Sequence, residues 1–266
     1  MLQARRPIAA DYAYFDRPFI AMAHRGGALL AANLERENTR HAFTEAAALG
    51  YDYFETDVHV TADGVLVAFH DDRLDRVTDR PGLIAERTWG EIAAARIGGR
   101  DSIPTLAELL ETFPDHRFNI DIKAPGAIEP LARTINHHRA HDRVCVGSFG
   151  VDRILAFRRL MGTQVPTSVA GPGVAWTRFV PGLPRLLNDA GVVFQMPIDW
   201  EIAGRRVRLL TRELVDRAHA AGKLVHVWTI DDPDTMHELI DLGVDGLISD
   251  RIDILKEVCL ERGLWA

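Results

Sequence analysis

Cysteine is scarce in this sequence, with only Cys145 and Cys259 among 266 residues. The two residues lie far apart and form no C-x-x-C pair, so their spacing favours neither a metal site nor a redox motif. We interpret both as small hydrophobic side chains of the core.

Long hydrophobic runs are missing as well. No stretch approaches the roughly 18 uninterrupted apolar residues of a membrane-spanning helix, so no membrane anchor is expected. The first residues, MLQARRPIAADYAYFDRP, contain charges and proline but lack the apolar segment of a secretory signal. These absences predict a cytoplasmic protein, and they are compatible with a substrate from lipid turnover.

An excess of positive charge is absent too. Lysine and arginine total 31 against 38 aspartate and glutamate residues, which gives a formal net charge of -7. A nucleic-acid-binding protein usually shows a basic face, so no nucleic-acid partner is expected. No linker-like or low-complexity segment divides the chain, and 266 residues suit one large domain. We therefore expect residues 1–266 to form a single domain, and the sequence leaves its oligomeric state open.

What the sequence does contain is a regular alternation of short apolar runs and amphipathic helical patterns. The runs that read as strands are FIAMAH, YFETDVHV, RFNIDIK, RVCVGSF, VPTSVA, VVFQMPI, KLVHVWTI and DGLISD. Strands that are mostly followed by helices indicate a parallel sheet with crossover helices. Eight such units in roughly 250 residues predict a (β/α)8 TIM barrel. A doubly wound open sheet is the alternative, although no G-x-G-x-x-G follows a strand.

A long segment, about residues 62–104, interrupts the alternation after the second predicted strand. It contains the strand-like run VLVAFH, which follows a turn at Ala62-Asp63-Gly64. Insertions of this length in compact domains are usually functional. Because this one follows the carboxyl end of a barrel strand, we expect it to lie over the catalytic face.

Polar residues gather at the ends of the predicted strands. His24 and Arg25 end the first strand, and Glu55 and Asp57 share one face of the second because side chains alternate along a strand. If that face points into a barrel, the two carboxylates repel each other unless positive charge lies between them. A divalent cation, which prefers hard oxygen ligands, resolves the conflict.

The third strand, in NIDIK, places Asp121 and Lys123 on one face. Asp121 could complete a three-carboxylate site, and Lys123 could contact an anionic group of a substrate. The alternative is a set of structural salt bridges among these acids and bases. Buried charges are expensive even when they are paired, so we favour the functional interpretation. His70 ends the inserted strand and could supply the second half of an acid–base pair, although alone it would be an ordinary surface or core histidine.

Several motifs occur in a specific order: AHRGG, ENT, FETDVHVTADG, VAFHDD, IPTLAELL and NIDIK. This string closely resembles the glycerophosphodiester phosphodiesterase family, and VHVWTI and GVDGLISDRID resemble its last two strands. The resemblance covers nearly the whole chain. It implies a barrel enzyme that hydrolyses glycerophosphodiesters to sn-glycerol 3-phosphate and an alcohol such as choline or ethanolamine.

The resemblance also implies roles for individual residues. His24 and His70 would be the acid–base pair, Arg25 and Lys123 would contact the phosphoryl group, Glu55, Asp57 and Asp121 would hold Mg²⁺ or Ca²⁺, and Trp228 would line the pocket wall. In the family mechanism the neighbouring glycerol hydroxyl attacks phosphorus, and water later opens the cyclic phosphate.

Two departures from the family pattern bear on specificity. The loop ALLAANLER is longer than usual and lacks the customary proline before Glu37, and Asp121 stands where the family commonly has glutamate. The Asp-x-Lys pattern also occurs in sphingomyelinase D-like phospholipases. The alternative function is therefore a phospholipase D-type hydrolase that acts on lysophospholipid or sphingomyelin headgroups, and an exposed apolar rim near the pocket would favour it. A non-catalytic binding barrel would require loss of a histidine or a carboxylate, and the set here is complete.

Other residues near these strand ends have simpler expected roles. His59 is expected to form a hydrogen bond in a loop, Glu37 and Asn38 to support Arg25 and cap the following helix, and Asp231, Asp232 and Asp250 could equally be helix caps. Trp176, Phe179, Pro172, Pro181 and Pro184 could form a rim, and nothing chemical singles them out.

Overall fold

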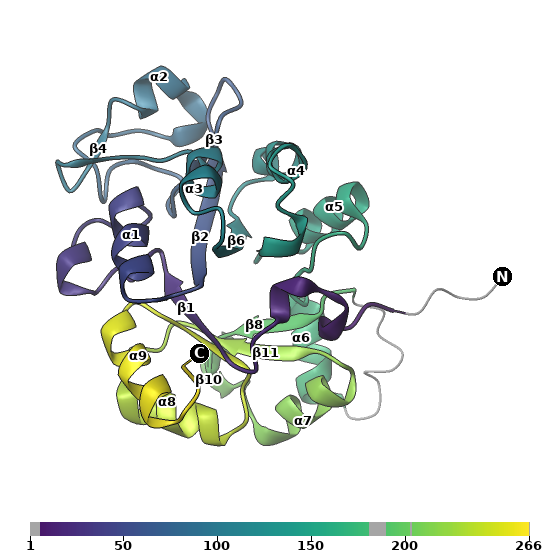
Figure 1. Ribbon diagram of the computed structural model, residues 1–266. Helices are drawn as coiled ribbons and strands as arrows, with labels where there is room; N and C mark the ends of the chain where they lie inside the picture. The colour runs from purple at the N-terminus through teal and green to yellow at the C-terminus, as the bar shows by residue number, and fades with distance from the viewer. Residues whose placement is uncertain (1–5, 181–189, 203, 266) are drawn as a thin grey trace.

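The computed structural model describes residues 6–180, 190–202 and 204–265, and these are built around a ring of parallel strands (Figure 1). In this part of the chain, seven parallel strands follow the order β7-β6-β2-β1-β12-β11-β8. Their bounds are β1 Ile20–His24, β2 Tyr53–Val60, β6 Arg117–Ile122, β7 Val144–Gly147, β8 Val193–Met196, β11 Leu224–Val227 and β12 Gly246–Ser249. Pro181 and Pro184 lie outside the described residues.

The eighth position in the ring is a short segment between β7 and β8. Thr167 forms a parallel bridge with Val146 on one side, and Ser168 forms one with Val193 on the other. Pro166 has no N–H group to donate, which keeps the segment too short to count as a strand. The predicted (β/α)8 barrel is confirmed, and the eight predicted runs occupy its eight positions.

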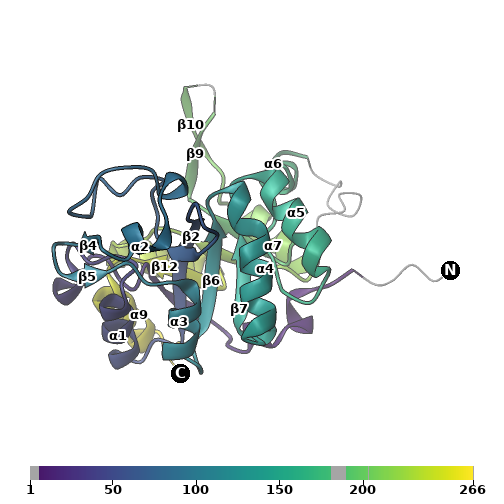
Figure 2. The ribbon, with the colours of Figure 1, turned by 90° about the horizontal axis from the view of Figure 1, so that it is seen from above.

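Helices surround the strands on the outside of the ring (Figures 1 and 2). The helical patterns in the sequence correspond to α1 Arg40–Ala48, α3 Leu106–Thr112, α5 Val151–Met161, α7 Arg212–Ala220, α8 Pro233–Asp241 and α9 Ile252–Glu261, and the structure adds α4 Ile128–His137 and α6 Gly171–Phe179. The N-cap of α1 is Thr39, which accepts a hydrogen bond from the Ala42 N–H, and not Asn38. The Asn38 side chain instead forms hydrogen bonds with side chains of β2.

The insertion after β2 forms a small layer with its own core. Its strand β3 (Leu66–Ala68) pairs antiparallel with β2, as the predicted hairpin requires. The rest contains α2 (Trp89–Ile92), β4 (Arg96–Ile97) and β5 (Asp101–Ser102). Buried apolar side chains of this segment form a cluster apart from the main core, and His70 of the same segment lines the pocket described below.

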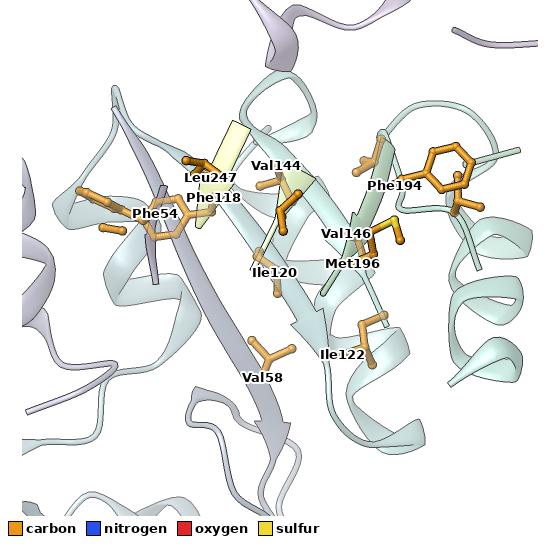
Figure 3. Packing of buried hydrophobic residues seen from close by; sticks show 14 of the residues in the cluster. Phe54, Val58, Phe118, Ile120, Ile122, Val144, Val146, Phe194, Met196 and Leu247 are labelled. Carbon is orange, nitrogen blue, oxygen red and sulfur yellow. The ribbon is translucent and has the colours of Figure 1, made fainter. Parts of the chain in front are cut away.

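Alternation along the strands separates two kinds of side chain. Outward-facing residues such as Phe54, Phe118, Ile120 and Val146 pack in the main core cluster that includes helix residues (Figure 3). A second cluster contains residues of the opposite parity in the same strands: Ile20, Met22, Tyr53, Cys145, Val193 and Ile248, with Tyr14 from the N-terminal segment. Both cysteines are free and buried, as predicted.

The interior positions change from apolar to polar along each strand. Met22 is followed two residues later by His24, and Tyr53 is followed by Glu55 and Asp57. The apolar end is closed where the Tyr53 hydroxyl donates to the Tyr14 carbonyl over 2.6 Å. The polar side chains therefore converge at the carboxyl end of the barrel, as the sequence indicates.

A hairpin absent from the sequence prediction rises beside this end. Its strands β9 (Asp199–Ile202) and β10 (Arg205–Arg208) pair antiparallel and project away from the barrel (Figure 2). Within the described residues, no helix combines the length and the hydrophobicity needed to cross a membrane.

Candidate active site

The carboxyl ends of the strands surround a pocket with a volume of about 520 Å³. Every residue for which the sequence predicts a site role lines it: His24, Arg25, Glu55, Asp57, His70, Asp121, Lys123 and Trp228. They come from β1, β2, β6, the insertion and the end of β11. The fold thus brings together side chains that are more than 200 positions apart in the sequence.

His24 lies between two carboxylates at the end of β1. Its Nδ1 is 2.8 Å from Oδ1 of Asp250, and its Nε2 is 3.6 Å from Oε2 of Glu55. A hydrogen bond to Asp250 fixes a proton on Nδ1 and leaves Nε2 to exchange a proton with a ligand. Burial alone would lower the pKa of His24, but Glu55 and Asp250 outweigh it and hold the pKa above its ordinary value.

Asp250 follows β12 and is held in place by Asp231 of the loop after β11. Oδ1 of Asp231 accepts a hydrogen bond from the Asp250 N–H over 2.8 Å, and a second from the Ser249 hydroxyl over 2.9 Å. Of the three late aspartates that could be helix caps, only Asp232 is one, because it accepts from the Thr235 N–H at the start of α8. Asp250 orients a histidine, and Asp231 orients the loop that carries Asp250.

His70 is held in a similar way by the insertion. Its Nδ1 is 2.6 Å from Oδ1 of Asp71, and its carbonyl oxygen lies 3.1 Å from Nε2 of His59. His59 lies within β2 and not in a loop beyond it, and its expected role as a hydrogen-bonding residue is confirmed. A hydrogen bond from Arg76 lowers the pKa of Asp71 to about 2, so this partner stays charged. Both pocket histidines therefore pair Nδ1 with a carboxylate.

Three carboxylates line one side of the pocket from the adjacent strands β2 and β6, where Asp57 and Asp121 are register partners. Burial and the charge of Asp57 raise the pKa of Glu55 to about 7. Burial would also raise the pKa of Asp57, but Lys123 and Arg25 hold it below its usual value. Burial keeps the pKa of Asp121 above its usual value. Burial therefore opposes the charged form of all three carboxylates, and Lys123 and Arg25 outweigh it at Asp57 alone.

The two cations of the pocket contact these carboxylates directly. Nζ of Lys123 is 2.9 Å from Oδ1 of Asp57 and 2.9 Å from Oδ2 of Asp121. Nε of Arg25 is 3.4 Å from Oδ2 of Asp57, and its Nη1 is 3.1 Å from Oε1 of Glu37. Both cations also line the pocket, where they can face an anionic ligand.

Arg25 lies in a turn of unusual backbone geometry at the edge of the pocket. Arg25 itself has a positive φ of 50°, and Gly26 and Gly27 follow with φ of 84° and 85°. A Cβ on Gly26 would come within 2.7 Å of the Cβ of Ala42 in α1, which is too close for two carbon atoms. The two glycines of the HRGG motif thus let the chain turn tightly against α1 beside the pocket.

Arg76 connects Arg25 to His70 through a chain of ion pairs. Its guanidinium donates to Glu37 over 2.9 and 2.7 Å and to Asp71 over 2.6 Å. Glu37 pairs in turn with Arg25, and Asp71 with His70. Asn38 holds the carboxylate of Asp57, because its side-chain amide donates a hydrogen bond to Asp57 over 3.2 Å.

The carboxylates match a hard divalent cation in their chemistry. Carboxylate oxygens are preferred ligands of Mg²⁺ and Ca²⁺. Oδ2 of Asp121 is buried and accepts no hydrogen bond from the described residues, although Lys123 lies within ion-pair distance. Among those same residues, no three or more His, Cys, Asp or Glu side chains are arranged as a metal site. Lys123 occupies the space between two of the three predicted ligands.

Four residues that shape this pocket could not be assigned a site role from the sequence, although Asp250 was expected as a possible helix cap. Asp250, Asp71 and Arg76 fix the histidines, and Trp200 of the β9–β10 hairpin lines the pocket. The sequence did contain signals for two of the four residues: Asp71 belongs to the HDD run, and Asp250 directly follows the last strand. Arg76 and Trp200 gave none, because their positions depend on how the insertion and the hairpin fold.

Comparisons with known proteins agree on one family. The model of the "Glycerophosphoryl diester phosphodiesterase family" matches residues 24–254. The protein named "Probable glycerophosphodiester phosphodiesterase 2" of Mycobacterium tuberculosis is 42% identical over 253 residues, which are 92% of this chain and 92% of that protein. A "Glycerophosphodiester phosphodiesterase" of Caldanaerobacter subterraneus subsp. tengcongensis is 31% identical over 266 residues, covering 92% of this chain and 99% of the other.

A solved structure is similar in fold. The phosphodiesterase of Oleispira antarctica, in complex with the product sn-glycerol-3-phosphate, matches with a TM-score of 0.76 at 24% identity, covering 93% of this chain and 98% of that one. The family match spans most of the chain, and it includes every predicted site residue. The chain therefore belongs to the glycerophosphoryl diester phosphodiesterase family and is a phosphodiesterase of that class.

Proposed function

We propose that this phosphodiesterase hydrolyses glycerophosphodiesters to sn-glycerol 3-phosphate and an alcohol, with His24 and His70 as its acid–base pair and a divalent cation as cofactor. The observation that carries the proposal is the meeting of two histidine–carboxylate pairs, three further carboxylates and two cations in one pocket. The product that is bound to the Oleispira antarctica phosphodiesterase supports the choice of substrate.

Arg25 and Lys123 bind and orient the phosphodiester. Negative charge increases on the non-bridging phosphoryl oxygens as a nucleophile approaches phosphorus, and fixed cations stabilise this charge without reorganisation. Glu37 holds the guanidinium of Arg25, and Asp57 and Asp121 hold the ammonium of Lys123. The two positive groups are thus positioned before the substrate binds.

The histidines move the protons. One Nε2 accepts the proton of the glycerol hydroxyl next to the phosphoester, and this hydroxyl attacks phosphorus with the advantage of an intramolecular reaction. The other Nε2 donates a proton to the oxygen of the leaving alcohol. The two rings exchange roles when water opens the cyclic phosphate to glycerol 3-phosphate. Asp250 and Asp71 keep both rings in the tautomer that these transfers need.

Glu55, Asp57 and Asp121 are the residues that would hold Mg²⁺ or Ca²⁺, and Nζ of Lys123, which lies 2.9 Å from a carboxylate oxygen of each aspartate, would have to leave the space between them. A bound cation supplies charge neutralisation at the phosphoryl oxygens. Asp121 is one methylene shorter than the glutamate that is common at this position of the family, so its carboxylate reaches less far from β6. The chemistry of the donors supports the cofactor, because three carboxylates from the adjacent strands β2 and β6 line one side of the pocket.

Release of glycerol 3-phosphate tests the proposed activity and the cofactor together. The purified protein is incubated with glycerophosphocholine or glycerophosphoethanolamine in Mg²⁺, in Ca²⁺ and in EDTA. We expect release with at least one metal and none in EDTA, with recovery when the metal is restored. Undiminished release in EDTA would contradict the cofactor, and no release with either metal would contradict the activity.

A further inference from the structure

The pocket combines three kinds of lining. Besides the charged group described above, it has an apolar half that is lined by Phe149, Val174, Phe179, Trp200, Ile202 and Leu209. The third kind is a set of neutral polar side chains: Asn119 of β6, Gln195 of β8 and Ser168 of the segment between β7 and β8. The proposed proton transfers and phosphate contacts use none of these three residues.

The three neutral side chains lie deep in the barrel. Gln195 follows Val193 by two residues, so their side chains share the interior face of β8, and Ser168 forms its bridge with the same Val193. Asn119 is the register partner of Cys145 in β7. Val193 and Cys145 belong to the apolar cluster of the barrel interior. We call Asn119, Ser168 and Gln195 the polar floor, since they form the layer next to this cluster.

The polar floor has hydrogen-bonding capacity that the described part of the chain does not use. Nε2 of Gln195 donates to Oδ1 of Asn119 over 2.7 Å, which leaves the N–H groups of Asn119 and the carbonyl oxygen of Gln195. Ser168 accepts a hydrogen bond at its backbone carbonyl, and its hydroxyl has no partner among the described residues. Asn119 and Ser168 are each only 5% exposed. Polar groups at this depth favour a ligand that completes their hydrogen bonds.

Gly147 of β7 makes room for two of these groups. A Cβ at position 147 would lie 3.0 Å from Oε1 of Gln195 and 3.4 Å from Oγ of Ser168. Both oxygen atoms therefore face the same small space above Gly147, which also lines the pocket. A side chain at this position would crowd them, so the glycine keeps the polar floor open to a small ligand group.

The chemistry of the polar floor matches an alcohol. It presents amide N–H donors, a carbonyl acceptor and a hydroxyl, and an alcohol group both donates and accepts a hydrogen bond. The trimethylammonium group of choline does neither, and the ammonium group of ethanolamine donates but does not accept. Each of these headgroups would leave part of the polar floor unpaired, whereas a glycerol hydroxyl would not.

The polar floor lies one interior position below the phosphate contacts. Asn119 precedes Asp121 by two residues on one face of β6, a rise of about 7 Å, and Asp121 contacts Lys123. His24 and Asn119 are both register partners of Glu55, so the histidine belongs to the level of the floor. A three-carbon chain that extends inward from the phosphate therefore reaches this level, where its hydroxyls meet both kinds of side chain.

We infer that Asn119, Ser168 and Gln195 bind the terminal hydroxyl of the glycerol moiety, which is the hydroxyl that does not attack phosphorus. This inference rests on the proposed function, because it places the phosphodiester between Arg25 and Lys123. Binding of the terminal hydroxyl fixes the direction of the three-carbon chain and leaves the neighbouring hydroxyl free to react. The polar floor thereby makes the enzyme selective for diesters of glycerol over diesters of simpler diols.

A substrate that lacks only this hydroxyl tests the inference. Choline release is measured with Mg²⁺ or Ca²⁺ from sn-glycerophosphocholine and from its 1-deoxy analogue, a phosphocholine ester of propane-1,2-diol that keeps the reacting hydroxyl. A site that binds a hydroxyl by hydrogen bonds discriminates against an analogue without it, because the polar groups of the site are left unpaired. We expect kcat/KM to be at least about tenfold lower for the analogue.

Substitutions in the polar floor assign the selectivity to its residues. Gln195→Met removes the carbonyl acceptor with little change in volume, and Ser168→Ala removes the hydroxyl. Each should reduce the ratio of kcat/KM for glycerophosphocholine to that for the analogue by at least about threefold. Gln164→Met is the matched control, since Gln164 is exposed after α5 and outside the pocket, and it should keep the ratio of the unaltered protein. Calorimetry with glycerol 3-phosphate and its 1-deoxy analogue should show the same preference in binding.

The outcomes separate the two claims. Equal kcat/KM values for the two substrates would overturn the inference and leave the proposed function standing. A ratio that stays unchanged in both floor variants would also overturn it, because a purely structural role lowers both rates together. No hydrolysis of either substrate by the unaltered protein would overturn the proposed function, and the inference with it.

Discussion

Individual residues of this pocket act in pairs. His24 is paired with Asp250 and His70 with Asp71, in each case through Nδ1 of the ring. The sequence indicates the two histidines because each ends an apolar strand. It does not reveal the role of Asp250, because that role depends on the ring closure that sets β12 beside β1 and so joins residues 226 positions apart.

Asp250→Asn tests the pairing. An amide in place of the carboxylate no longer stabilises the charged imidazole, so we expect kcat to fall by about 10-fold to 100-fold with little change in KM. Since Asp250 helps to hold the pKa of His24 above its ordinary value, the pH–rate limb that reflects His24 should move to lower pH. Kinetics of glycerol 3-phosphate release across pH 5–9 check both effects.

Asp232→Asn is the matched control, because Asp232 follows the neighbouring strand and caps α8. Asparagine is as good an N-cap as aspartate, so activity and stability should be retained. An Asp250→Asn protein with a wild-type kcat and pH profile would show that Asp250 has only a structural role.

Elements differ in how clearly the sequence reveals them. The barrel strands follow from their apolar runs and from polar residues at their carboxyl ends. Helix α6 could not be predicted from the sequence because it begins with Gly171-Pro172-Gly173, which has a poor helix propensity. The β9–β10 hairpin could not be predicted because its strands are short and largely exposed. Strands that are not buried in a core lack a clear alternation of apolar and polar residues. Both elements line the pocket, so most of its apolar half could not be predicted. Of the two aromatic residues offered as a rim, Phe179 lines the pocket and Trp176 does not.

The insertion acts on the pocket through Arg76. Arg76→Gln removes the ion pairs to Glu37 and Asp71, which loosens the supports of Arg25 and His70 together. We expect kcat to fall by about threefold to tenfold, since one orienting group is lost and the acid–base groups remain. The melting temperature should change little, because the Arg76 side chain is largely exposed. Steady-state kinetics and thermal melting check the two expectations.

Arg73→Gln is the control from the same segment, where Arg73 pairs with Asp75 at the surface, away from the pocket. Its activity should equal that of the unaltered protein. Equal losses of kcat in the two variants would mean that Arg76 acts only through the general stability of the insertion.

The closed barrel explains why the polar side chains of the pocket gather at the carboxyl ends of the strands. Alternation in a closed barrel directs every second side chain inward, and in this chain those positions are apolar at the amino ends of the strands and polar at the carboxyl ends. The N-terminal segment closes the apolar end with Tyr14, and the insertion and hairpin border the polar end. The fold class and the polar residues that line the pocket could be predicted from this pattern, but the carboxylates that hold the histidines required the assembled barrel.

His24 and His70 are the two residues proposed to perform the proton transfers of phosphodiester hydrolysis. The most direct measurement is glycerol 3-phosphate release from the preferred diester by the unaltered protein and by His24→Ala and His70→Ala, at saturating metal. We expect kcat to fall by at least about 100-fold in each variant, while circular dichroism shows that both variants remain folded. A folded variant that retains a kcat within threefold of the unaltered protein would contradict the assignment of that histidine.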